Sequence, residues 1–162
     1  RFVADEIKLL VPNLAPQVLT PAVESLAFPD RTEARHDLHI SDEACIVLSV
    51  TRLVPRKGID LLLQAMPHLP SRLRLVVIGD GEDAGRLGQI SEERGLSDRV
   101  TFLSRITDEE RNRWYAAADL FAMPTRDEGT DVEGFGIVYL EAALAGLPIV
   151  AGRSGGAPEA IE

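Results

Sequence analysis

The stretch Cys45–Met66, which reads CIVLSVTRLVPRKGIDLLLQAM, combines the pattern of a buried strand with that of the helix after it. Residues 46–50 lack the polar alternation of a half-buried strand, as expected for a strand covered on both faces. Apolar residues then recur at helical spacing until Pro67: Ile59, Leu62, Leu63 and Met66. This strand–turn–helix unit decides the fold class.

The same unit recurs along the rest of the chain. Further strands are predicted at 73–78, 100–103, 120–123 and 148–151, and helices at 82–94, 107–117, 136–145 and from Ala157 onward. Gly95 is the expected C-terminal cap of the helix over 82–94, and Thr107 with Glu110 forms a capping box. Strands that alternate with helices indicate a parallel sheet. The prediction is α/β: a doubly wound, Rossmann-like parallel sheet.

Residues 1–44 do not follow this pattern. Apolar residues at helical spacing predict a helix over residues 1–12. Residues 13–44 hold three prolines and have mixed polarity, which predicts an irregular connector with one short strand near Val18–Leu19. We therefore expect a connector over 1–44 and the sheet domain over 45–162. Neither end carries a start methionine or a closing signal, which suggests an excised domain.

Composition and charge exclude several classes of protein. The 162 residues are 45% hydrophobic and 27% charged, which suits one globular domain rather than a disordered or collagen-like chain. The net charge of -9 would repel a nucleic acid, so none is expected as a partner. No apolar run is long enough to be a transmembrane segment. The single cysteine, Cys45, cannot form an internal disulfide, which predicts a reducing, cytoplasmic location.

Positive charge follows the first strand, at the end of the sheet where ligands are expected. Arg52, Arg56 and Lys57 place three cations within six residues of an otherwise acidic chain. Arginine offers a planar fork for phosphate oxygens and lysine a compact charge. Gly58 leaves room beside the amides that begin the next helix, and such amides also favour an anion. The pattern favours a phosphate site, with a solvated turn as the alternative.

The segment after the fourth strand is acidic. It holds four carboxylates within seven residues: Asp127, Glu128, Asp131 and Glu133. Their spacing is not that of an EF-hand, and no metal site is predicted. Glu133 and Glu141 are eight residues apart and flank the turn Gly134-Phe135-Gly136. Burial of Glu141 among apolar neighbours would be costly without a polar partner.

Three strand ends thus carry a basic turn, a glutamate pair and a glycine turn. Together they resemble the retaining glycosyltransferases of family 4, also called group 1, in three blocks: Arg52 with Lys57, Glu133-Gly134-Phe135-Gly136-Ile137-Val138-Tyr139-Leu140-Glu141, and Gly155-Gly156-Ala157-Pro158-Glu159. The resemblance covers residues 45–162 and is greatest to phosphatidylinositol mannoside mannosyltransferases. It departs at Pro21-Ala22-Val23-Glu24, where Pro-Gly-Val-Asp is usual.

The resemblance implies the C-terminal half of a GT-B enzyme. Residues 45–162 would be its nucleotide-sugar-binding Rossmann-like domain, truncated at the C-terminus, and residues 1–44 a remnant of the interdomain connector. An acceptor lipid or glycan would be bound mainly by a missing N-terminal domain, so the isolated domain would be inactive. A lipid acceptor would be compatible with membrane association of the full-length enzyme.

The resemblance also implies a role for each site residue. Arg52 and Lys57 would bind the diphosphate and offset the charge of the leaving nucleotide, and Glu133 would hold hydroxyls of the transferred hexose. These three are the expected catalytic residues. Glu141 would accept hydrogen bonds from the ribose, and the backbone near Ile106 would contact the base. The remaining donor contacts would come from Gly134, Phe135, Gly136 and Ile137. GDP-mannose is the favoured donor, with no metal and no cofactor.

Other functional classes give weaker matches. Gly79, Gly81 and Gly85 form a loose dinucleotide fingerprint, so an NADP-binding Rossmann module is the alternative function. Gly152-x-Ser154-x-Gly156 matches a nucleophile elbow, but all three histidines precede Ser154, which excludes a complete hydrolase in the usual chain order. A non-catalytic interaction domain is the third alternative.

Overall fold

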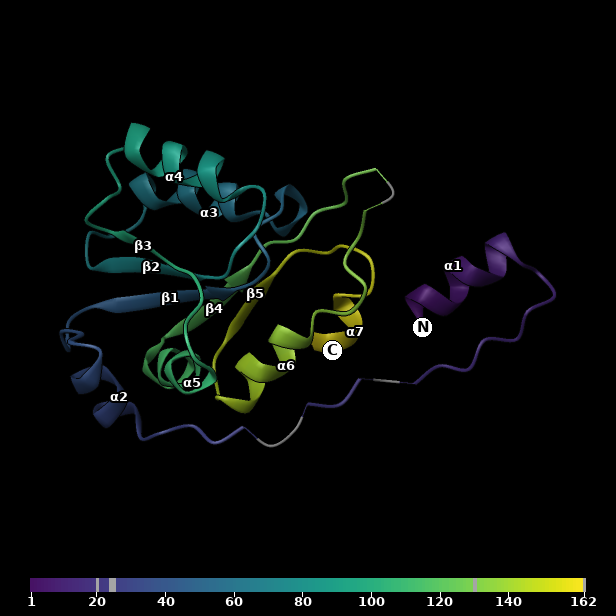
Figure 1. The fold of residues 1–162 in the computed structure, drawn as a ribbon, viewed down its shortest axis with the longest axis horizontal. Helices are drawn as coiled ribbons and strands as arrows, with labels where there is room; N and C mark the ends of the chain where they lie inside the picture. Colours follow the sequence, from purple (N-terminus) through teal and green to yellow (C-terminus); the bar gives the residue numbers. More distant parts are fainter. Residues whose placement is uncertain (20, 24–25, 130, 162) are drawn as a thin grey trace.

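Five parallel strands form one sheet in the order β3-β2-β1-β4-β5 in the computed structural model, which describes residues 1–19, 21–23, 26–129 and 131–161 (Figure 1). The strands are β1 (Cys45–Val50), β2 (Leu73–Ile78), β3 (Val100–Leu103), β4 (Leu120–Met123) and β5 (Ile149–Ala151). The helices of the sheet domain are α3 (Ile59–Ala65), α4 (Ala84–Glu93), α5 (Asp108–Ala117), α6 (Ile137–Leu144) and α7 (Pro158–Ile161). The predicted α/β class, the parallel sheet and its five strands are confirmed.

Helices cover both faces of the sheet (Figure 1). On one face, α3 and α4 pack over a cluster of buried side chains that includes Val47, Leu63, Val77 and Leu87. The other face is covered by α5 and α6, over a cluster whose largest members are Tyr115, Phe121 and Tyr139. Burial on both faces explains why the strands show continuous apolar runs rather than alternation.

The order of the strands reverses at the centre of the sheet. β1 pairs with β2 on one side and with β4 on the other, so the chain first builds toward β3 and then returns to build toward β5. The loop after β1 leads to α3 on one face of the sheet and the loop after β4 leads to α6 on the other face, so the switch point lies between β1 and β4. Ligands of doubly wound sheets bind at such a switch point.

The predicted connector contains more structure than expected. The helix predicted over residues 1–12 is present as α1 (Phe2–Leu10), but residues 13–44 also contain α2 (Arg31–Asp37), so the irregular assignment is wrong there. Asp30 caps α2 by accepting hydrogen bonds from the amides of Thr32 and Glu33. This helix has no apolar stripe that a sequence pattern could reveal. It is held instead by Arg35, which is 6% exposed and donates to the carbonyls of Ala117, Ser41 and Ala44.

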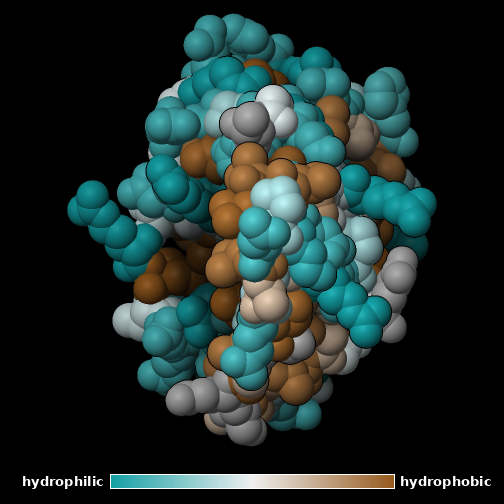
Figure 2. Space-filling view, turned by 90° about the vertical axis from the view of Figure 1, so that its right-hand side faces the viewer, coloured by the Kyte–Doolittle hydropathy of each residue, from teal (hydrophilic) through white to brown (hydrophobic). Residues whose placement is uncertain are grey.

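The strand predicted near Val18–Leu19 is also wrong, because both residues lie outside any strand. Pro16 and Pro21 flank them, and a strand needs a neighbour for its backbone groups, which this exposed segment does not have among the described residues. α1 lies apart from the sheet and near α7 (Figure 1). Figure 2 shows a band of hydrophobic residues on that side of the molecule. Leu9, Leu10 and Leu19 of the N-terminal segment are exposed. Glu24, Thr130 and Glu162 lie outside the described residues.

Candidate functional site

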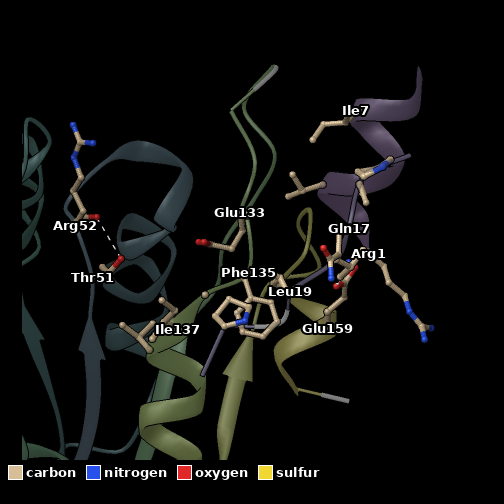
Figure 3. A pocket seen from close by; sticks show the side chains of 18 of the residues that line it. Arg1, Ile7, Gln17, Leu19, Thr51, Arg52, Glu133, Phe135, Ile137 and Glu159 are labelled. Carbon is tan, nitrogen blue, oxygen red and sulfur yellow. Dashed lines mark hydrogen bonds and ion pairs between the residues drawn. The ribbon is translucent and has the colours of Figure 1, made fainter. Parts of the chain in front are cut away.

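A pocket of about 620 Å³ opens at the carboxyl ends of the strands (Figure 3). One wall comes from the loop after β1 and the loop before α6, with Thr51, Arg52, Lys57 and the run Glu133–Val138. The other wall comes from the N-terminal segment, where Ile7 of α1, Gln17 and Leu19 are drawn opposite Phe135. The structure thus brings Arg52, Lys57 and Glu133 to one pocket together with the predicted backbone residues from Gly134 to Ile137.

A short 3-10 turn, η1 (Pro55–Lys57), presents Arg56 and Lys57, and Arg52 precedes this turn. Pro55 sits at the start of this turn, and Gly58 ends it with a positive φ of 70°. A Cβ at Gly58 would lie 2.1 Å from the carbonyl oxygen of Pro124, so the absence of a side chain lets the turn pack against the end of β4. Lys57 is consequently only 8% exposed. Arg52 is exposed, and no side-chain ion pair holds it among the residues that the structure describes.

Glu133 is the buried carboxylate of the pocket, with 6% of the residue exposed. Its Oε2 atom lies 2.5 Å from Lys57 Nζ and 3.0 Å from Arg56 Nη1. Burial alone would raise the pKa of Glu133, but the hydrogen bond and charge of Lys57, with the charge of Arg56, outweigh it and lower this pKa. Glu133 is therefore an ionised acceptor at neutral pH.

The acidic loop, residues 126–133, is held at several points. Its Arg126 donates two hydrogen bonds to the buried Asp60 of α3, at 2.9 and 3.0 Å. Ser154 is 1% exposed, donates to Asp127 at 2.6 Å and accepts from the Glu133 amide at 3.3 Å. The Gly156 amide donates to the Glu133 carbonyl at 2.7 Å. The nucleophile-elbow match thus corresponds to a serine that anchors the loop.

The helix α6 begins at the pocket. Gly136 precedes it with a φ of 84°, and a Cβ there would lie 2.5 Å from the Tyr139 ring, so this turn requires glycine. Tyr139 is fully buried and donates to the Met123 carbonyl at 2.8 Å, which fixes α6 against the end of β4. The Tyr139 amide donates to the Gly136 carbonyl at 2.9 Å, whereas the amides that precede it at a helix start have no intrahelical acceptor and are oriented as in anion sites.

Glu141 lies farther along α6 and does not line this pocket. Its Oε2 atom accepts a hydrogen bond from the Tyr115 hydroxyl at 2.8 Å. This bond is the polar partner that a partly buried glutamate requires, and burial followed by the Glu141 charge raises the pKa of Tyr115. The two glutamates of the motif are therefore held by different neighbours.

A second pocket, of about 400 Å³, adjoins the first. The two share Thr51, Arg52 and Val138, and the second also contains Ile106 and Arg105, which has a positive φ of 56°. Arg52 and Ile106 are thus brought together. Sequence reasoning missed the roles of Arg56, Ser154 and Tyr115. Arg56 was visible as a cation, but no local pattern indicates which carboxylate it contacts.

The glycines of the alternative NADP module have a different use. A Cβ at Gly79 would lie 1.8 Å from the Thr51 carbonyl oxygen, and one at Gly81 would lie 2.1 Å from that of Leu53, so both allow close packing of two loops. Gly85 has open space around it. No group of His, Cys, Asp and Glu side chains within the described ranges could hold a metal ion. Among the described helices, none has the length and apolar character required to cross a bilayer.

Comparisons with known proteins agree with this geometry. Residues 30–162 match the family described as Glycosyl transferases group 1. The chain is 41% identical, over 93% of its length, to the GDP-mannose-dependent alpha-(1-6)-phosphatidylinositol monomannoside mannosyltransferase of Mycolicibacterium smegmatis, and it spans 41% of that relative. A crystal structure of Anabaena HepE with UDP and glucose is similar at a TM-score of 0.70 and 32% identity, over 82% of this chain and 36% of that one.

A second similar structure is itself a separate domain. It is the C-terminal domain of the glycosyl transferase group 1 protein LpcC from Francisella tularensis, with a TM-score of 0.64 and 25% identity, over 82% of this chain and 70% of that one. The chain therefore belongs to the group 1 glycosyl transferases and corresponds to the C-terminal domain of their GT-B fold.

Proposed function

We propose that this chain is the donor-binding domain of a retaining glycosyltransferase, which transfers a hexose from a nucleoside diphosphate sugar to an acceptor. The observation that carries the proposal is the placement of Glu133 beside Lys57 in one pocket with Arg52. A carboxylate that can accept from sugar hydroxyls thus adjoins cations that can bind phosphate oxygens. The name of the mycolicibacterial relative favours mannose as the sugar and GDP as the carrier.

Each group has a role in the proposed reaction. When the glycosidic bond to the donor breaks, negative charge builds on the leaving diphosphate. Arg52 and Lys57 would bind its oxygens and offset this charge, each charge-assisted hydrogen bond contributing about 1.5–3 kcal/mol. The amides of Phe135, Gly136 and Ile137, around the start of α6, would add about 1 kcal/mol through the helix dipole.

Glu133 would orient the hexose, because its carboxylate is fixed by Lys57 and lines the pocket. Glu141 would accept from the ribose with the oxygen that Tyr115 leaves free. The neighbouring pocket, with Ile106, would receive the base and shares Arg52 with the first pocket. An acceptor lipid or glycan would be bound mainly outside this chain, by an N-terminal domain of the longer enzyme.

The first expected result is that this chain binds a nucleoside diphosphate but does not transfer sugar by itself. Calorimetry with GDP, UDP and ADP and their sugars, in buffer with EDTA, measures the binding and identifies the base. Arg52 and Lys57 provide the positive charge, so added Mg²⁺ should leave the affinity unchanged. NADPH is the control ligand. Binding of NADPH without binding of any nucleoside diphosphate would overturn the proposal in favour of the dinucleotide module.

The second expected result separates the two glutamates. Glu133→Gln should weaken GDP-mannose and leave GDP nearly unchanged, whereas Glu141→Gln should weaken both ligands, each loss being about 1–3 kcal/mol. The amide keeps the shape of the side chain and removes its charge. Calorimetry of both variants with both ligands measures these losses. Equal losses of GDP and GDP-mannose in the Glu133 variant would defeat the assignment of Glu133 to the sugar.

A further inference from the structure

Arg56 contacts both ends of the acidic loop. Its carbonyl accepts a hydrogen bond from the Arg126 amide at 2.8 Å, where the loop begins. Its guanidinium reaches the other end, with Nε 2.9 Å from Asp131 and Nη1 3.0 Å from Glu133. The side chain is 18% exposed and does not line the main pocket, although its neighbour Lys57 and its partner Glu133 do. Arg56 thus holds Glu133 from outside the ligand space.

Lys57 has two competing partners in the proposed reaction. In the structure its ammonium group is 2.5 Å from Glu133 Oε2, the shortest ion pair of the pocket. A diphosphate in the pocket would draw the same ammonium group. If Lys57 were the only cation on Glu133, this movement would leave a carboxylate that is 6% exposed without a counter-charge, which is strongly unfavourable. Lys57 would then be retained by Glu133.

We propose that Arg56 is a positioning residue that holds the Glu133 carboxylate so that Lys57 can turn to the diphosphate. This inference rests on the proposed function of the pocket. A guanidinium suits the task because two of its nitrogens reach different carboxylates: Nη1 donates a hydrogen bond to Glu133, while Nε is in ion-pair contact with Asp131. An ammonium group at the same position would have a shorter reach and no fork.

The inference predicts that Arg56→Met weakens GDP binding because Glu133 retains Lys57. Removal of the competing carboxylate should then restore binding, so the double variant Arg56→Met/Glu133→Gln should bind GDP as Glu133→Gln does. We expect a loss of about tenfold in the single variant and recovery to within about threefold in the double variant, as for contacting charged residues in a double-mutant cycle. Arg56→Lys should lie between the wild type and Arg56→Met.

The matched control is Arg126→Met. It removes an arginine of the acidic loop itself, and the partners of this arginine are Asp60 and Glu128 rather than Glu133. We expect its GDP affinity to stay within about twofold of the wild type, because loop anchoring alone does not release Lys57. Calorimetric titration with GDP measures every variant, and thermal unfolding shows which of them fold. If Arg56→Met does not fold, Arg56→Lys and its double variant with Glu133→Gln carry the same comparison.

Three results decide the matter. Recovery of GDP binding on addition of Glu133→Gln supports the inference, because a residue that only stabilises the loop would not be rescued in this way. Unchanged GDP affinity in Arg56→Met, or a double variant as weak as the single one, overturns it and leaves the proposed function intact. Failure of the wild-type chain to bind any nucleoside diphosphate overturns the proposed function, and this inference with it.

Discussion

Lys57→Met is expected to weaken binding of a nucleoside diphosphate by about 10- to 100-fold, the loss that corresponds to one hydrogen bond between charged groups. Methionine keeps the length and apolar stem of the side chain while removing the ammonium group, so the pocket should keep its shape. Arg72→Met is the control, because Arg72 is an exposed cation that does not line the pocket. Calorimetry with GDP on both variants measures the difference. An unchanged affinity in Lys57→Met would remove Lys57 from the donor site.

The same substitution should lower the stability of the fold in a pH-dependent manner. The pKa of Glu133 is lowered in the folded chain, so its ion pairs stabilise the fold fully above the pKa of an unfolded glutamate, about 4.3, and this stability is lost as the pH falls through the folded pKa. The free energy of unfolding of Lys57→Met should therefore fall below that of the wild type by about 1–3 kcal/mol at neutral pH. Urea denaturation should show this gap narrowing below about pH 4.

Gly79→Ala should be the most destabilising single substitution that we predict, at about 3 kcal/mol or more, from backbone strain and overpacking together. Gly79 has a φ of 147°, and a Cβ there would lie 1.8 Å from the carbonyl oxygen of Thr51. That contact is with backbone, which cannot turn away as a flexible side chain can. Separation of the two loops would also displace Arg52, which follows Thr51 and lines both pockets.

Gly85→Ala is the matched control for Gly79→Ala. Gly85 lies in α4, and apart from its chain neighbours and the backbone of its own helix nothing lies within 4 Å of the position that a Cβ would take, so alanine should stabilise the helix by about 0.5–1 kcal/mol. Urea denaturation of the two variants measures the opposite signs. Equal stabilities for Gly79→Ala and the wild type would show that the two loops are not packed as described.

The position of Glu141 shows that the spacing of the Glu133–Glu141 motif does not indicate which of its glutamates lines a pocket. Spacing places Glu133 before the helix and Glu141 within it, and the structure confirms both positions relative to α6. It also shows that Glu141 contacts Tyr115 and lines neither the main pocket nor its neighbour, whereas Glu133 lines the main one. The two glutamates look equivalent in the motif but have different neighbours: Glu141 contacts α5, and Glu133 contacts η1.

The sequence by itself determined the succession of strands and helices along the chain from β1 to α7. Their apolar periodicity is visible locally, because each strand is buried on two faces and each helix on one. It also determined which charged residues follow the strand ends, and hence that Arg52, Lys57 and Glu133 would meet at one edge of the sheet. The helix α2 escaped this reasoning, because a charged helix held by the buried Arg35 has no apolar stripe.

Only the tertiary structure decided which of these charges pair. Glu133 contacts Arg56 and Lys57 across 77 and 76 residues of chain, and Tyr115 contacts Glu141 across 26. Three cations within six residues are equivalent in a local pattern, but in the fold Lys57 is buried beside the left-handed Gly58, which packs on Pro124, whereas Arg52 is exposed. Ion pairs depend on distances of a few ångströms between remote segments, and only the packed fold sets those distances.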